Sequence, residues 1–271
     1  MCPHCRAFIT TDDRVCPYCQ TEVGPRAVDR RRTADAISGL IPQARFTTMV
    51  IMLINTGLYI ATVLHSMRSG AGGIDPSLQT LELFGAKWGP DIASGQYWRL
   101  ITAGFLHGGI LHILMNMWVL FDLGAQVEEV CGTSRMLVIY LFSNITGFYL
   151  STYFNFRILS IGASAAIFGL IGGMIGVGLR DRTSYGQAIR RFFMRWAIYG
   201  LIMSLIPGID MWAHIGGLAG GFVVGFIAGT PGYSSATERA WQIAAGVMIA
   251  LTGFAFYDML DYLIHAASQA T

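Results

Sequence analysis

Seven apolar segments dominate this chain of 271 residues and limit the folds that are open to it. A helix of about 20 residues crosses a hydrocarbon core that is about 30 Å thick. Because lipid offers the backbone no hydrogen-bond partners, such segments span a membrane as helices. The sequence therefore predicts an all-α, multi-pass membrane protein. The expected spans are 46–67, 110–126, 136–154, 164–180, 192–206, 213–229 and 241–264.

The composition supports this class of protein. The chain is 54% hydrophobic and only 13% charged, whereas a soluble domain carries about 25% charged residues. Its net charge of +2 is too small to indicate a nucleic-acid partner. The chain opens with cysteines and charged residues instead of an apolar signal sequence, so we expect the first span to act as an uncleaved insertion signal.

The placement of arginine predicts the orientation in the membrane. Residues 25–45 form an arginine-rich linker before the first span, and a second arginine cluster lies within residues 180–195. Loops rich in arginine and lysine stay in the cytoplasm, and an even number of expected spans separates the two clusters. We therefore expect a cytoplasmic N-terminus. Lys87 is the only lysine, which points to a GC-rich bacterial genome and so to the bacterial cytoplasmic (inner) membrane.

A serine and a histidine begin two of the expected spans. Ser164 begins the fourth and His214 the sixth, so both side chains lie at one depth near the outer face. A serine hydroxyl is a weak nucleophile until a base removes its proton, and a histidine inside a membrane is costly and usually functional. Either residue alone is also consistent with a structural role. Their shared depth favours a serine nucleophile paired with a histidine base.

Glycines recur at every fourth position of the same two spans. They are Gly217, Gly221 and Gly225 on the sixth span and Gly172 and Gly176 on the fourth. Small residues at this spacing let two helix backbones approach closely. A hydrogen bond of about 2.6–3.2 Å between a serine and a histidine requires such an approach. Plain helix packing also explains the glycines, so they do not indicate chemistry by themselves.

A third polar element lies on the second span. His112 and Asn116 are four residues apart, so they share one face of the helix. Their side chains and the Ser164 backbone N–H could donate hydrogen bonds to a developing oxyanion. A pair that only joins two helices is the alternative. A metal held by His107 and His112 would lack an acidic third ligand, so we expect no catalytic cofactor.

No acidic residue stands out as a partner that would orient His214. Asp210 lies four residues before it, but in an expected loop, so we expect a Ser–His dyad instead of a triad. Phe168 lies one helical turn after Ser164 and could stack on the imidazole. A plain role in the core suits Phe168 equally well.

These motifs together resemble those of the rhomboid family of intramembrane serine proteases. The resemblance covers about residues 46–230 and implies a six-helix rhomboid bundle, with a loop and a seventh transmembrane helix in residues 231–271. Each motif is short, but five motifs in this order and spacing are highly specific. They are Trp98-Arg99, His107-x4-His112-x3-Asn116, Gly124-x3-Glu128, Gly162-x-Ser164-x3-Phe168 and Ala213-His214-x2-Gly217-x3-Gly221.

The resemblance implies an intramembrane serine endopeptidase that cuts transmembrane-helix substrates near the outer face. The implied roles are nucleophile for Ser164, general base for His214, and oxyanion-hole side chains for His112 and Asn116. The alternative is a non-catalytic rhomboid-like protein that binds transmembrane helices, although a binder needs neither the serine nor the histidine. A transporter fits less well, because the spans mostly lack charged residues at mid-depth.

The resemblance also assigns structural roles and contains one departure. Trp98 and Arg99 would belong to a half-buried first loop, and Glu128 to a structural polar network. Ala165 stands where many members have a glycine after the serine. Its methyl group could narrow the oxyanion site.

Residues 1–24 form a separate cysteine module with the spacing C-x2-C-x10-C-x2-C. Two such thiolate pairs are typical of a tetrahedral zinc site. A thioredoxin-type redox role needs a βαβ context that this short module cannot supply, and disulfides are disfavoured in the cytoplasm. A folding staple and a docking site for a cytoplasmic partner remain open as roles. The expected ligands of one structural zinc ion are Cys2, Cys5, Cys16 and Cys19.

Overall fold

The structure is a computed structural model that divides the chain into two compact units, Met1–Phe46 and Thr47–Thr271. The expected basic linker 25–45 lies outside the described residues, so its cytoplasmic location remains a prediction from the sequence. The described residues are 2, 4, 5, 7, 8, 15–22, 46–71, 73–232 and 234–269.

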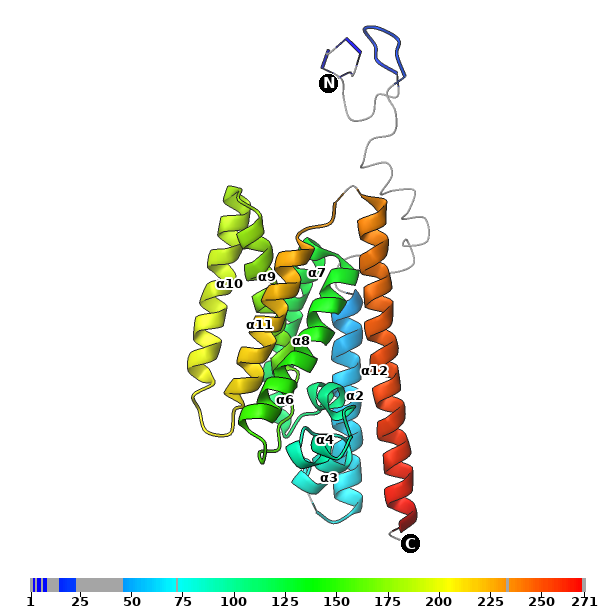
Figure 1. Cartoon of the computed structure of the whole chain (residues 1–271), viewed down its shortest axis with the longest axis vertical. Coiled ribbons are helices and arrows are strands. Elements are labelled where there is room, and N and C mark those ends of the chain that lie inside the picture. The colour runs from blue at the N-terminus through cyan, green and yellow to red at the C-terminus, as the bar shows by residue number, and fades with distance from the viewer. Residues whose placement is uncertain are drawn as a thin grey trace. The chain divides into compact units, whose positions relative to one another are not determined.

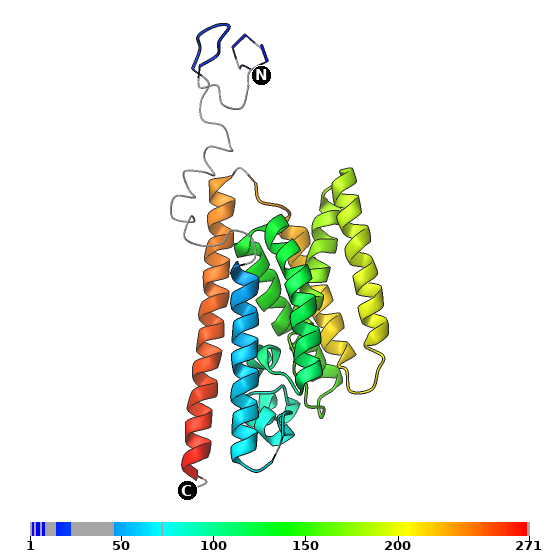
Figure 2. The ribbon, with the colours of Figure 1, turned by 180° about the vertical axis from the view of Figure 1, so that it is seen from behind.

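The larger unit consists of helices that run side by side (Figures 1 and 2). In both views α10 forms one edge of the bundle and α12 the other. A π-helical turn, η3, joins α6 to α7, so these two form one continuous helical rod. The helical elements of the bundle are α2 (Phe46–Arg68), α6 (Ile110–Val119), η3 (Leu120–Gly124), α7 (Ala125–Cys131), α8 (Thr133–Phe154), α9 (Ser164–Arg180), α10 (Ser184–Met203), α11 (Met211–Ala228) and α12 (Ser235–Gln269).

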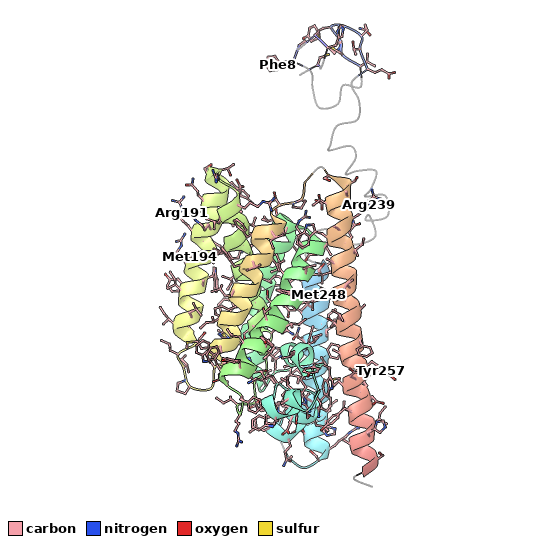
Figure 3. The ribbon with its side chains drawn as sticks, viewed as in Figure 1. Phe8, Arg191, Met194, Arg239, Met248 and Tyr257 are labelled. Atoms are coloured by element: carbon pink, nitrogen blue, oxygen red, sulfur yellow. The ribbon has the colours of Figure 1, made fainter. Side chains whose placement is uncertain are left out.

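Five of the described helical segments are long and apolar enough to cross a membrane, namely α2, α6 to α7, α8, α11 and α12. Helix α9 is apolar but has 17 residues. Helix α10 has 20 residues, and the arginines of its first half lower its mean hydropathy. Met194 of α10 and Tyr257 of α12 are exposed and point away from the bundle (Figure 3), as expected where helices face lipid.

Several helices extend beyond the apolar segments that the sequence marks. The second segment was expected to end at residue 126, but the helix continues to Cys131. The fifth was expected over 192–206, whereas α10 covers Ser184–Met203. The reason is that glutamate and arginine are good helix formers although they lower hydropathy. The length of an apolar segment therefore predicts which part of a helix crosses the lipid better than it predicts where the helix begins and ends.

Helix α9 lies at the centre of the bundle and touches the backbone of α11 directly. A Cβ atom added to Gly221 would lie 1.9 Å from the carbonyl oxygen of Gly169, and one added to Gly225 would lie 2.1 Å from that of Gly173. No side chain fits between the two helices at these points. The row on α9 that faces Gly217 and Gly221 begins with Ala165, whereas the expected Gly172 and Gly176 row packs beside it on Leu218 and Phe222.

The first loop folds into short helices at the end of the bundle where α2 ends (Figure 1). They are α3 (Leu78–Leu83), α4 (Gly89–Ala93), α5 (Arg99–Thr102) and the 3-10 turn η2 (Ala103–Phe105). The fully buried Arg99 guanidinium donates to the carbonyls of Glu82 and Ala86 and pairs with Asp91 at 2.9 Å. One buried cation thereby joins α3, α4 and α5.

Glu128 holds the start of α2 against the end of the α6–α7 rod. Its carboxylate accepts hydrogen bonds from the backbone N–H groups of Thr47 and Thr48 at 3.1 and 3.2 Å, and from the Thr48 hydroxyl at 3.1 Å. A helix leaves its first N–H groups without partners, and a negative charge there is favourable. The buried carboxylate therefore caps the first membrane helix.

We expect Glu128→Ala to lower the free energy of unfolding by about 2–3 kcal/mol, because it leaves buried N–H groups without an acceptor. Thermal unfolding of the purified protein in detergent measures the change. The matched control is Glu129→Ala, since Glu129 is exposed. Equal melting temperatures for the two variants would contradict the capping role.

Candidate active site

Ser164 and His214 are hydrogen-bonded to each other. The distance from Ser164 Oγ to His214 Nε2 is 2.8 Å. Ser164 is the first residue of α9, and His214 lies in the first turn of α11. His214 is only 6% exposed. The structure thus brings together the two residues that the sequence paired by depth, in a geometry that suits proton transfer from the hydroxyl.

Phe168 stacks on the imidazole of His214. The two ring centroids are 4.2 Å apart and the planes are inclined by 14°. The edge of the Phe168 ring lies against Gly200 of α10, where an added Cβ would be 2.5 Å from Phe168 Cζ. Of the two roles that the sequence left open, Phe168 therefore fills both: it is buried in the core and it holds one face of the imidazole.

Ser204 contacts the second nitrogen of the imidazole. Its Oγ lies 2.6 Å from His214 Nδ1, and the residue is 3% exposed. Ser204 also donates to the Gly200 carbonyl at 2.7 Å. Sequence reasoning sought an acidic partner for His214 and missed this one. A single serine at the end of an apolar helix is common, so no pattern in the sequence marks it.

Asp210 fixes the start of α11 but makes no described hydrogen bond to the imidazole. As the N-cap of α11 it accepts from the Ala213 N–H at 3.2 Å and from the Asn155 side chain at 3.0 Å, and the Ser151 hydroxyl also donates to it. Burial alone would raise the pKa of Asp210, but hydrogen bonds from Ser151, Ser160 and the Ala213 N–H, together with nearby Lys87, lower it below its usual value. The carboxylate anchors the helix that carries His214 to the end of α8.

Lys87 joins the first loop to the segment that leads into Ser164. Its ammonium group donates to the carbonyls of Asn155 and Ile158 at 2.7 and 3.0 Å. Its backbone also pairs with Ser160 at 2.9 and 3.0 Å. Burial lowers the pKa of Lys87 to about 8, against the opposing effect of Asp210. The first loop and the approach to α9 are therefore held as one structure.

His112 presents one ring nitrogen toward the start of α9. Its Nδ1 accepts a long hydrogen bond of 3.4 Å from the Gly108 N–H, which leaves Nε2 to carry the proton. A Cβ added to Gly162 would lie 2.7 Å from this Nε2 and 3.6 Å from Ser164 Oγ. His112 Nε2 therefore lies beside Gly162, close to the start of α9. Asn116 follows one turn later on α6 and is 7% exposed.

Gly162 is required by both its backbone and its neighbours. Its φ is +124°, in the region that favours glycine. An added methyl group would collide with the His112 ring. Its N–H donates to the Ala103 carbonyl at 2.9 Å, which ties the segment before Ser164 to the first loop. This glycine lets His112 approach the serine.

The methyl group of Ala165 lies near α8. A Cβ added to Gly147 would be 2.8 Å from the Ala165 Cβ, so the missing side chain at Gly147 makes room for this methyl group. Ala165 itself is fully buried. Gly147 therefore accommodates the methyl group, and the expected narrowing of the oxyanion site stays a prediction.

The four N-terminal cysteines cluster in the smaller unit. Their sulfur atoms all lie within 4.8 Å of one another. Cys2 and Cys19 are 3.6 Å apart and Cys5 and Cys16 are 3.7 Å apart, so each contact joins one motif to the other. Sulfurs of a tetrahedral zinc site, with bonds of about 2.3 Å, are about 3.8 Å apart. The donor set and its spacing therefore fit a zinc ion.

Comparison with known proteins agrees with these observations. A rhomboid domain profile matches residues 94–231. The chain is 40% identical over 157 residues to RHOMBOID-like protein 7 of Arabidopsis thaliana, which covers 57% of this chain and 50% of the plant protein. It is 37% identical over 189 residues to the Rhomboid protease GluP of Bacillus subtilis, which covers 69% of this chain and 37% of GluP.

A third relative is Rhomboid-like protease 3 of Toxoplasma gondii, with 33% identity over 151 residues that cover 54% of this chain and 57% of the relative. The chain spans about half the length of the curated relatives it matches. The domain profile alone covers half of this chain. The chain therefore belongs to the rhomboid family, is a multi-pass integral membrane protein, and is homologous to rhomboid proteases.

Proposed function

We propose that this protein is an intramembrane serine endopeptidase that uses a Ser164–His214 dyad. The observation that carries the proposal is the 2.8 Å contact between the serine hydroxyl and the imidazole Nε2, at the matched starts of α9 and α11. Homology to rhomboid proteases supports the same reaction. A protein that only binds transmembrane helices has no use for an activated serine.

The reaction begins when His214 Nε2 removes the proton of the Ser164 hydroxyl as its oxygen attacks the substrate carbonyl. The oxyanion that forms accepts hydrogen bonds from the His112 Nε2–H, the Asn116 amide and the Ser164 backbone N–H. The imidazolium then protonates the leaving amine. A water molecule, activated by the same imidazole, hydrolyses the acyl-enzyme and restores the serine.

The proposed substrate is the transmembrane helix of another protein. Backbone groups in such a helix are paired with one another and shielded from attack. Cleavage therefore requires local unwinding, which favours substrates with helix-breaking or small residues. Since the dyad lies where α9 and α11 begin, we infer that the substrate is cut near one face of the membrane and not at its centre.

Charge supports an orientation with this face outside. Most of the described arginines lie toward the opposite end of the bundle, where Arg191 and Arg239 lie on α10 and α12 (Figure 3). Arg68, Arg99 and Arg157 are the exceptions, at the end that carries the site. Because arginine-rich ends stay in the cytoplasm, we propose a cytoplasmic N-terminus and seven crossings that include α9 and α10. Six helices would form the protease bundle, with α12 as an added seventh, in a bacterial cytoplasmic membrane.

The first test is labelling by a fluorophosphonate probe, which reacts covalently with activated serines. We expect the wild-type protein to be labelled and Ser164→Ala to lose labelling while it keeps its melting temperature. The same variant should not cleave a single-span reporter substrate in detergent. Labelling or cleavage that persists in Ser164→Ala would refute the assignment. A wild-type protein that is never labelled would favour the non-catalytic binder.

A second test concerns the oxyanion site. Gly162→Ala adds a methyl group that meets His112 Nε2 at 2.7 Å, so the ring must move away from Ser164. We expect the rate of reporter cleavage to fall by about 10²-fold or more, as when an oxyanion donor is lost. Gly57→Ala is the control, because a Cβ there meets no atom within 4 Å. An unchanged rate in Gly162→Ala would exclude His112 from the oxyanion site.

We also propose that Cys2, Cys5, Cys16 and Cys19 hold one structural zinc ion, which would crosslink the two short motifs. Metal analysis of the purified full-length chain should find about one zinc per chain. Cys16→Ser should lose the metal, because it removes one of four thiolates. Cys131→Ser should retain it, since Cys131 is buried beside Met174 in the other unit. A wild-type chain without zinc would overturn the proposal.

A further inference from the structure

We infer that Ser204 is a positioning residue that holds His214 in the tautomer and orientation of a general base. The inference rests on the proposed function and concerns the imidazole nitrogen that faces away from Ser164. Nδ1 lies 2.6 Å from Ser204 Oγ, while Nε2 lies 2.8 Å from Ser164 Oγ. The imidazole therefore bridges two hydroxyl groups, and only one of them can be its proton donor in a productive site.

Counting hydrogen bonds decides which hydroxyl donates. The Ser204 hydroxyl has one proton, and the Gly200 carbonyl lies 2.7 Å away to accept it. Ser204 Oγ then accepts from the Nδ1–H of His214, and Nε2 accepts from Ser164. This pattern makes three hydrogen bonds. The opposite tautomer, with hydrogen on Nε2, makes two, because the Ser204 hydroxyl would then donate to Nδ1. The Gly200 carbonyl would accept only from the Ser204 backbone N–H, at 2.9 Å.

The favoured pattern also matches what the reaction demands. When His214 takes the proton of Ser164, both of its nitrogens carry hydrogen and each needs an acceptor. Ser204 Oγ already accepts from Nδ1, so no group has to turn as the positive charge develops. Without it, a charged N–H would lack a partner in a buried site, which is costly. A neutral hydroxyl thus does the orienting that a carboxylate does in serine protease triads.

The C-terminal end of α10, with its C-cap Ser204, holds the ring in two ways. Its Ser204 side chain fixes the Nδ1 edge, and Gly200 packs on Phe168, which covers one face of the imidazole. Asp210 and His112 are the titratable groups whose charges would act on His214. Neither makes a hydrogen bond to the imidazole among the described residues. Ser204 is therefore the group that can set the tautomer.

The test compares Ser204→Ala with Ser204→Thr in the purified full-length protein. We expect Ser204→Ala to slow fluorophosphonate labelling by about 10- to 100-fold, the effect of losing one hydrogen bond to a charged group. Ser204→Thr should restore most of the rate, because it keeps the hydroxyl. The control is Thr252→Ala in α12, whose hydroxyl likewise donates to the carbonyl four residues earlier, at 2.8 Å, but has no imidazole beside it.

Nitrogen-15 NMR of histidine-labelled protein supplies a readout that a merely structural role would not move. The His214 resonance, identified by its loss in His214→Asn, should show hydrogen on Nδ1 in the wild type and on Nε2 or on both in Ser204→Ala. An unchanged tautomer in Ser204→Ala would overturn the inference even if labelling slowed. If the wild type is not labelled at all, the proposed protease function fails, while the tautomer comparison still decides the role of Ser204.

Discussion

The arrangement of this site depends on direct backbone contact between α9 and α11. Gly217, Gly221 and Gly225 place the α11 backbone against carbonyl oxygens of α9 with no side chain between them. In a membrane, apolar side chains gain little free energy by exchanging contacts with lipid for contacts with one another. Close packing of this kind is therefore a main source of helix association. The two helices begin at the same end, so the contact aligns Ser164 with His214. The same glycines therefore serve both the bundle and the site.

Buried charged groups hold the loops around this contact. Arg99 joins the three short helices of the first loop, Lys87 joins that loop to the segment before Ser164, and Asp210 joins the ends of α8 and α11. Arg99 and Lys87 donate largely to backbone carbonyls, which supply buried acceptors for the two cations. Asp210 instead accepts from the side chains of Ser151 and Asn155 as well as from a backbone N–H. An unpaired charge near a membrane interior costs free energy. Each of these groups therefore favours the loop conformation in which it is paired. The active-site geometry is thus prepared before a substrate arrives.

The sequence predicts features that depend on depth in the membrane or on a regular spacing of residues. It does not predict features that depend on the direction in which a single side chain points. Arginine placement and the glycine rows indicated that the fourth and sixth spans begin together and touch. The partner of His214 was sought among acidic residues, whereas the structure places Ser204 there. The direction of the Ala165 methyl group depends on a gap at Gly147, far away in the sequence. Such contacts carry no periodic signal along the chain.

The π-helical turn Leu120–Gly124 sets the rotational phase between the two halves of the α6–α7 rod. A turn of this kind contains one residue more than an α-helical turn, and each residue advances an α-helix by about 100°. On the α6 side the rod presents His112 to the site, and on the α7 side it presents Glu128 to the start of α2. Because of the extra residue, the two halves of one rod can direct His112 and Glu128 toward different neighbours. The length of this turn therefore sets how the His112 face of the rod is oriented relative to its Glu128 face.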